Sequence, residues 1–290
     1  MSKLLLIILL GTAILVLQLT CVTYILFWYE AANSSYRKEL DQLSQGKTKT
    51  WILRGILTSF FSLLLVVLSY PLGFWMRQRH PEPHVTCRFP PVILIHGLYH
   101  NAGAWVLCRY WLKRAGFRNI YTFEYNSWKS SFGDCLEGLV RRAQEVKALF
   151  PQQKVVLIGH SLGGVLSRAC GDSEACGKDI QAVVTLGSPH KGSKLAVLGL
   201  GRLAESLVYG GAFMEEMERT AAPRRNIPRL ALYSPVDNMV LPNHALETSC
   251  EGWVHRRIAP ISHVAILYHR PTAKLILDHL EKIVQETVET

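Results

Sequence analysis

Several features of repeat, disordered and metal-binding proteins are absent from this sequence of 290 residues. It contains no internal repeat and no low-complexity tract, which excludes repeat arrays and disordered chains. It has no CxxC motif and no Cys/His spacing of the kind that holds zinc. No run of Lys or Arg exceeds two residues, so the net charge of +10 does not indicate a nucleic-acid-binding arm, and we expect no nucleic-acid partner.

Charged residues are missing from two long segments near the N-terminus. Leu4–Tyr29 and Ile56–Trp75 contain no Asp, Glu, Lys, Arg or His. Because about 20 helical residues cross the roughly 30 Å hydrocarbon core of a bilayer, both segments are predicted to be transmembrane helices, at about 4–29 and 56–75. A signal peptide is the alternative for the first segment, but its apolar run is too long and no small-x-small cleavage site follows. A buried helix of a soluble protein is the alternative for the second.

The segment between these helices, Glu30–Thr50, is short and polar and is predicted to be a hairpin loop. Residues 1–76 would then form a membrane anchor, with residues 77–290 on the opposite side of the bilayer from the loop. The basic residues of the loop slightly favour a cytoplasmic loop and a large domain on the periplasmic or outer side. Residues 77–290 hold 26 Lys and Arg against 19 Asp and Glu, which suits a domain that lies against an anionic lipid surface.

Short apolar segments rich in β-branched residues alternate with longer helical patterns after a proline-containing linker at residues 77–89. This alternation predicts an α/β fold for residues 90–290, with a mostly parallel sheet flanked by helices. The expected strands are Pro91–Ile95, Asn119–Tyr125, Lys154–Ile158, Ile180–Leu186, Arg229–Tyr233 and Trp253–Ala259. The expected helices are 134–150, 162–170 and 272–287.

Cysteine usage leaves the redox compartment open, although six of the seven cysteines follow the second apolar segment. Cys170 and Cys176 flank a five-residue segment that a disulfide could close in an oxidising compartment. Buried free thiols are the equally ordinary alternative.

A predicted strand and a predicted helix meet at a Gly-x-Ser-x-Gly sequence, residues 159–163. A sharp turn at this point would hold Ser161 in a strained conformation, and Gly159 and Gly163 would leave room for it. The helix that begins at Leu162 would point its N-terminal dipole at the hydroxyl, which favours a developing negative charge. Such a pattern also occurs by chance, but the strand, the helix and the position in the chain agree. We therefore predict that Ser161 is a catalytic nucleophile.

A serine nucleophile needs a base and a group that orients this base. Asp237 follows the fifth predicted strand directly, and His263 follows the sixth strand and precedes the last helix. We predict Asp237 as the orienting acid and His263 as the general base; a turn-capping carboxylate and a structural histidine are the alternatives. Weaker candidates are Glu247 and Glu251 for the acid, and His244, His255 and His269 for the base.

An oxyanion hole needs two backbone N–H donors near the nucleophile. Leu162 offers the first, because it directly follows Ser161. Leu98 is predicted to offer the second, since Gly97 lets the chain turn after the first strand. His96 stands at the end of that strand, where a structural hydrogen bond suits it better than a role as base.

The stretches Val92–Leu98, Gly159–Gly164 and Leu186–Ser193, together with the Asp237/His263 pair, resemble the α/β-hydrolase superfamily and within it the bacterial triacylglycerol-lipase-like and esterase branch. The resemblance covers about residues 90–290 and does not extend to the two apolar segments. It implies an α/β-hydrolase fold; together with the two apolar segments, it leads us to expect an integral protein of a bacterial inner membrane.

The resemblance also places a lid over the site, at about residues 191–226, where apolar residues alternate with glycines. A mobile apolar cover and an ordinary packed helix both remain open, and Phe213, Met214 and Met217 are expected in the core. Such lipases often hold calcium between two aspartates near the catalytic acid. No aspartate lies between Asp179 and Asp237 or between Asp237 and Asp278, so no metal is expected.

Together these residues predict a membrane-anchored serine hydrolase that cleaves carboxylic esters, of the lipase or esterase type, with a lipid or acyl-ester substrate and no cofactor. An acyltransferase or an amidase would use the same three residues. A catalytically silent membrane scaffold is the alternative outside the enzyme class.

Overall fold

Six parallel strands form the centre of the molecule in this computed structural model, which describes residues 3–77, 83–220 and 227–289. The strand order is β2-β1-β3-β4-β5-β6. The strands are β1 (Val92–Ile95), β2 (Ile120–Phe123), β3 (Val155–His160), β4 (Ile180–Leu186), β5 (Arg229–Tyr233) and β6 (Trp253–Arg257). Each lies where the alternating pattern predicted a strand, and β1 and β3 are buried along their whole length, as expected for a sheet covered on both faces.

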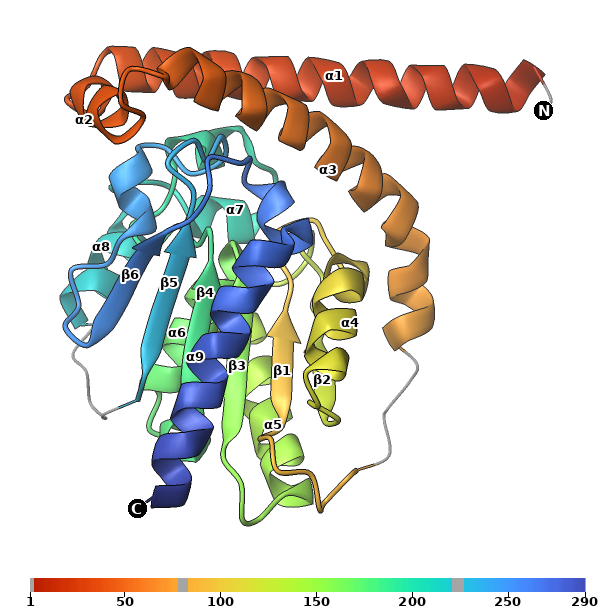
Figure 1. The fold of residues 1–290 in the computed structure, drawn as a ribbon, viewed down its shortest axis with the longest axis vertical. Coiled ribbons are helices and arrows are strands. Elements are labelled where there is room, and N and C mark those ends of the chain that lie inside the picture. Colours follow the sequence, from red (N-terminus) through yellow and green to blue (C-terminus); the bar gives the residue numbers. More distant parts are fainter. Residues whose placement is uncertain (1–2, 78–82, 221–226, 290) are drawn as a thin grey trace.

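Helices cover the two faces of this sheet (Figure 1). On one face, α5 (Phe132–Leu149) and α6 (Leu162–Asp172) pack in one apolar cluster with Ile93 and Leu157. On the other face, α4 (Val106–Arg114) and α9 (Arg270–Glu289) pack against Val92 and Leu94. Neighbouring residues of β1 thus point to opposite layers, because successive side chains of a strand alternate between the faces of the sheet.

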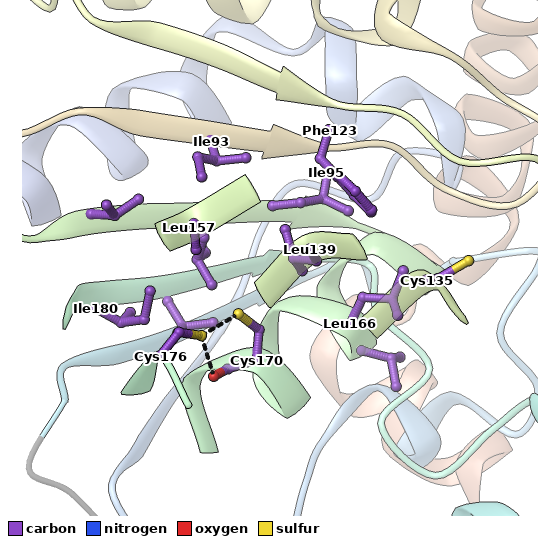
Figure 2. Close-up of a cluster of buried hydrophobic side chains, with 14 of the residues drawn as sticks. Ile93, Ile95, Phe123, Cys135, Leu139, Leu157, Leu166, Cys170, Cys176 and Ile180 are labelled. Atoms are coloured by element: carbon purple, nitrogen blue, oxygen red, sulfur yellow. Dashed lines mark hydrogen bonds between the residues drawn. The ribbon is translucent and has the colours of Figure 1, made fainter. Parts of the chain in front are cut away.

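Two cysteines lie in the apolar layer under α5 and α6 (Figure 2). The Sγ atoms of Cys170 and Cys176 are 2.8 Å apart, and both side chains are fully buried. All seven cysteines carry free thiols in the structure, so this pair fills the core as two small apolar residues would.

The N-terminal segment forms a hairpin of two long helices, which we call the N-terminal hairpin. It consists of α1 (Lys3–Ala32), the short α2 (Tyr36–Leu43) and α3 (Thr48–Arg77). Both α1 and α3 are long and apolar enough to cross a membrane, and α3 begins eight residues before the predicted span. The hairpin does not stand apart from the rest of the chain. Its α1, its α2 and the first half of α3 lie over the carboxyl ends of the strands, and the second half of α3 descends along the side of the domain next to α4 (Figure 1).

The loop of the N-terminal hairpin contacts the α/β domain directly. The Tyr36 hydroxyl donates a 2.7 Å hydrogen bond to the carbonyl of Pro235, and Arg257 pairs with Glu39 at 2.5 Å. A loop on the far side of a bilayer could not make these contacts. The expected topology places the loop and residues 77–290 on opposite sides of a membrane, whereas in the structure the loop contacts these residues.

Candidate active site

Ser161 stands at the sharp turn between β3 and α6 with φ 54° and ψ −127°, a conformation that L residues rarely adopt. The turn requires glycine on both sides. A Cβ at Gly159 would lie 2.2 Å from the carbonyl oxygen of Gly163, and a Cβ at Gly163 would lie 2.2 Å from that of Ile95. The Gly-x-Ser-x-Gly pattern thus has the packing role that the sequence predicted. The turn holds Ser161 half-buried at the carboxyl end of the sheet.

Asp237 and His263 meet at this end of the sheet although they are 26 residues apart. Their atoms Oδ2 and Nδ1 are 2.8 Å apart. The second carboxylate oxygen of Asp237 accepts hydrogen bonds from the amides of Met239 (2.9 Å) and Val240 (3.0 Å). Asp237 is fully buried and His263 nearly so, and the carboxylate has a donor on each oxygen. This arrangement orients the imidazole with Nδ1 toward the acid and leaves Nε2 for another partner.

Two glycines leave room for the three residues. A Cβ at Gly97 would lie 3.0 Å from the Cβ of Ser161. A Cβ at Gly187 would lie 3.2 Å from both Oδ2 of Asp237 and Nδ1 of His263. Any larger side chain at these positions would press on the predicted nucleophile or on the predicted acid–base pair.

Two polar residues that the sequence analysis missed support His263. The Nε2 atom of His160 lies 3.2 Å from the carbonyl oxygen of His263, and the two rings lie 4.7 Å apart. The amide of His263 donates to Oδ1 of Asn238 at 3.2 Å. The only sequence signal was that these residues adjoin Ser161 and Asp237.

Burial keeps the neighbouring histidines neutral. It lowers the pKa of His160 well below the ordinary value, and the nearby His263 lowers it further. Burial lowers the pKa of His96 to about 4. A neutral His96 forms no ion pair with Glu124, which lies 3.9 Å away, and its Nδ1 lies 2.8 Å from the carbonyl oxygen of Gly97. His96 has the structural hydrogen bond that its position predicted.

The weaker candidates for the acid and the base are engaged elsewhere. Glu247 accepts a hydrogen bond from the hydroxyl of Tyr233. His255 accepts from the amide of Thr248 at 3.2 Å. His244 pairs with Tyr209, and His269 with Thr272.

The two amides predicted for an oxyanion hole flank Ser161. Leu162 is the first residue of α6, and Leu98 follows Gly97 in the loop after β1. Within the described parts of the chain, neither amide donates a hydrogen bond to another protein group. Both donors are thus available to a ligand, and Leu162 has the dipole of α6 behind it.

The N-terminal hairpin holds the loops that carry Asp237 and His263. The hydroxyl of Tyr24 donates to the carbonyl of Val236 at 3.0 Å, and Nδ2 of Asn238 donates to Oγ1 of Thr23 at 2.8 Å. From α3, Oγ1 of Thr58 accepts from the amide of Ser262 at 3.0 Å. Val236, Asn238 and Ser262 each adjoin a predicted catalytic residue in the sequence. The N-terminal hairpin therefore packs directly against the loops of the site.

The expected lid region contains the helices α7 (Arg202–Ser206) and α8 (Ala212–Thr220), while its last residues, 221–226, lie outside the described chain. Leu203, Leu207 and Met214 are buried in the apolar core, as expected for Met214, and Met217 packs against this core. Phe213, which was also expected there, is exposed. Just before α7, the side chains of Val197, Leu198 and Leu200 are each about two-thirds exposed. The segment is therefore a packed element with an exposed apolar tip.

In the described ranges, no three His, Cys, Asp or Glu side chains lie close enough together to hold a metal ion.

A parallel sheet with a strained serine after its third strand, and a His–Asp pair after its fifth and sixth, defines the α/β-hydrolase class. Comparisons agree with this class. Residues 120–201 match the family described as PGAP1-like alpha/beta domain. The chain thus combines an α/β-hydrolase fold with a match to the PGAP1-like family over these residues and with distant homology to triacylglycerol lipases.

Individual relatives are distant. A triacylglycerol lipase of Pseudarthrobacter phenanthrenivorans is 32% identical over 114 residues, which are 37% of this chain and 35% of that protein. The chain thus matches only about a third of the length of this curated relative. A mature lipase of Bacillus licheniformis has a similar fold with a TM-score of 0.55 and 19% identity, covering 70% of this chain and 94% of that one. Lipase B of Aspergillus fumigatus has a TM-score of 0.61 and 15% identity, with coverage of 70% and 55%.

Proposed function

We propose that the protein is a membrane-associated serine hydrolase that cleaves carboxylic esters of lipids or other acyl compounds. The observation that carries the proposal is the buried 2.8 Å contact between His263 and Asp237 beside the strained Ser161. A carboxylate with all its hydrogen bonds made and a histidine beside an elbow serine form the arrangement that activates a hydroxyl group.

In the proposed reaction, Ser161 attacks the acyl carbon of the ester while Nε2 of His263 takes the hydroxyl proton. Asp237 keeps the other imidazole proton on Nδ1 and stabilises the imidazolium that forms. The amides of Leu98 and Leu162 donate to the oxyanion. His263 then protonates the leaving alcohol, and water releases the acyl group from Ser161 by the same steps.

A lipid substrate is supported by the relatives and by the surface around the site. The sequence relatives are triacylglycerol lipases, and the apolar tip at Val197, Leu198 and Leu200 is exposed beside the site's loops. Ser193, at the start of the same segment, donates its hydroxyl proton to the carbonyl of Met239 at 2.7 Å, which ties the segment to the loop of Asp237. The two long apolar helices support attachment to a membrane.

The first experiment is labelling of the detergent-solubilised protein with a fluorophosphonate, which reacts with activated serines of any substrate class. We expect labelling of the native protein, and none of Ser161→Ala or His263→Ala. Turnover of an ester should fall by about 10⁴-fold or more in either variant. A folded native protein that is not labelled would overturn the proposal in favour of a silent scaffold.

A substrate panel separates the remaining enzyme classes. Lipid esters, the matching amides and an added alcohol as acyl acceptor should be compared at equal concentration. Hydrolysis of the esters supports the proposal. Faster cleavage of the amides indicates an amidase, and acyl transfer to the alcohol in preference to water indicates an acyltransferase.

A further inference from the structure

The end of α1 and the loop that follows it are fastened to the α/β domain. At the end of α1, Lys194 pairs with Glu30 at 2.8 Å. Within the loop, Tyr36 and Glu39 contact Pro235 and Arg257, as described above. The loop and the domain must therefore lie on the same side of any membrane that holds the hairpin.

Neither long helix has enough free length to cross a bilayer while these contacts persist. From Val16 onward, one side of α1 is buried, and at Thr20 it contacts Ser59 of α3, next to the Thr58 that binds the domain. This leaves residues 3–15, or about 20 Å of helix, to extend beyond these contacts. Contacts to the domain at Thr58 and Tyr70 occupy the middle of α3. A hydrocarbon core of about 30 Å is longer than either free segment.

The N-terminal hairpin has two different faces. The face toward the domain carries hydroxyl groups that form hydrogen bonds, among them those of Thr23, Tyr24 and Thr58. The opposite face is apolar and exposed. Its side chains include Leu15, Leu19, Val22 and Ile25 of α1 and Leu53, Leu57, Phe61, Leu65 and Leu68 of α3.

We propose that the N-terminal hairpin lies along one leaflet of a bilayer, without crossing it, and places the carboxyl end of the sheet against the membrane surface. The occupant of its outer apolar face is the acyl region of this leaflet, and the free apolar residues 3–15 extend into it. The exposed basic residues Lys38, Lys47 and Lys49 lie at the bend, where anionic headgroups would pair with them. The inference rests on the membrane attachment proposed above but not on the reaction.

This orientation sets how substrate reaches Ser161. The strands point their carboxyl ends toward the hairpin (Figure 1), so the predicted nucleophile lies between the sheet and the membrane-facing helices. An ester bond of a bilayer lipid lies near the headgroup level, at the same depth as a site under a helix pair in one leaflet. A lipid in this leaflet would therefore need to move only a short distance out of the leaflet to reach Ser161.

The test compares the sidedness of the loop and of the domain. Lys47→Cys marks the loop and Lys178→Cys marks the domain, each in a background in which Cys21, Cys87 and Cys250 are replaced by Ser. Both lysines are exposed. A membrane-impermeant maleimide should label both positions from the same side of sealed membrane vesicles. Labelling from opposite sides would overturn the proposal and restore two transmembrane spans.

Two controls test whether the protein stays in the membrane and whether its domain is folded. Alkaline carbonate should leave the protein in the membrane pellet, and its release would overturn the one-leaflet hairpin as well as the attachment. Each cysteine variant should react with the fluorophosphonate as the background does, which shows that the domain is folded. Same-side labelling of a protein that never reacts with the fluorophosphonate would support the hairpin and contradict the hydrolase.

Discussion

At the scale of single residues, the hydrogen-bond partner separates histidines that look equivalent in the sequence and are all buried. His263 shares a hydrogen bond with a carboxylate, whereas the hydrogen bonds of His160 and His96 go to carbonyl oxygens, and both rings stay neutral. A carbonyl oxygen holds the N–H of a neutral imidazole, whereas a carboxylate also stabilises the charged form that a general base must adopt. The polar partner, more than the position in the chain, decides which histidine can serve as the base.

Because the buried histidines are neutral in the folded state, the stability of the protein should fall as the pH is lowered. The pKa of His96 is about 4 in the folded state and about 6.5 in an unfolded chain, so only the unfolded state binds the proton between these values. Protonation of His96 in the unfolded state should therefore lower the free energy of unfolding by about 3 kcal/mol as the pH falls from about 6.5 to about 4. The His96→Asn variant should be less stable at pH 7 but show a shallower loss in acid, measured by thermal unfolding in detergent from pH 8 to 4. The matched change at the exposed His84 should leave the slope unaltered.

The sequence was sufficient to predict Ser161, Asp237 and His263 as candidates because each lies in the connection after a strand, and parallel strands end at one edge of the sheet. It was insufficient for His160 and Asn238. Their contacts depend on which way a side chain points from a turn, and no periodic pattern records this direction. The catalytic roles themselves stay predictions until the serine is tested.

At the scale of elements, α1 and α3 act on the predicted catalytic pair through single hydroxyl groups. Removing the hydroxyl in Thr23→Val or Thr58→Val leaves a buried N–H without its acceptor. We expect kcat to fall about 5- to 10-fold with little change in KM, because a loop that holds Asp237 or His263 loses one hydrogen bond. Thr23→Ser and Thr58→Ser should restore the rate.

The control for these variants is Thr20→Val. Thr20 is also buried, one turn before Thr23 and Tyr24, but its hydroxyl contacts Ser59 of α3 and neither catalytic loop. Its kcat should match that of the native protein. Equal losses in Thr20→Val and Thr23→Val would show that the hydroxyl groups only stabilise the helix pair.

The close approach of α3 to the segment after β1 predicts that a larger residue at Gly103 destabilises the protein. A Cβ at Gly103 would lie 2.3 Å from the carbonyl oxygen of Ser69, and this backbone oxygen cannot move without shifting α3. Gly103→Ala should reduce the free energy of unfolding by about 1–3 kcal/mol. Gly133→Ala, where the nearest atom lies 3.9 Å away, serves as the control and should not be destabilised. Chemical unfolding in detergent measures both, and equal stabilities would contradict the close packing.

The sequence predicted the six strands and the two long apolar helices, but it did not predict the contacts of the N-terminal hairpin with the α/β domain. A strand in a parallel sheet is apolar because protein covers both its faces, and the pattern of the next helix confirms this. An apolar helix has the same composition whether lipid or protein covers it. The signal that could have separated the two is the stripe of Thr20, Thr23, Thr58, Ser59 and Ser62, whose hydroxyl groups face other parts of the protein.

At the scale of the whole molecule, the native cysteines report which surface meets lipid. Cys21 is exposed on α1, whereas Cys87 and Cys250 are half-buried in the α/β domain. In membranes, a water-soluble maleimide should modify Cys87 and Cys250 faster than Cys21, although Cys21 is the most exposed thiol of the isolated protein. Denaturation in dodecyl sulfate should make all three react, and mass spectrometry assigns each site. Fast modification of Cys21 in intact membranes would mean that lipid does not cover α1.

The contacts between the N-terminal hairpin and the catalytic loops also determine when, during synthesis of the chain, the hairpin can complete its folding. Tyr24 and Val236 are 212 residues apart, and Thr23 and Asn238 are 215 apart. The apolar helices leave the ribosome first, yet their hydroxyl groups find partners only when nearly the whole chain has been synthesised. Until then the helices can be covered only by lipid or by a chaperone. A newly made chain would thus reach the membrane before it has a complete active site, and no ester would be cleaved on the way.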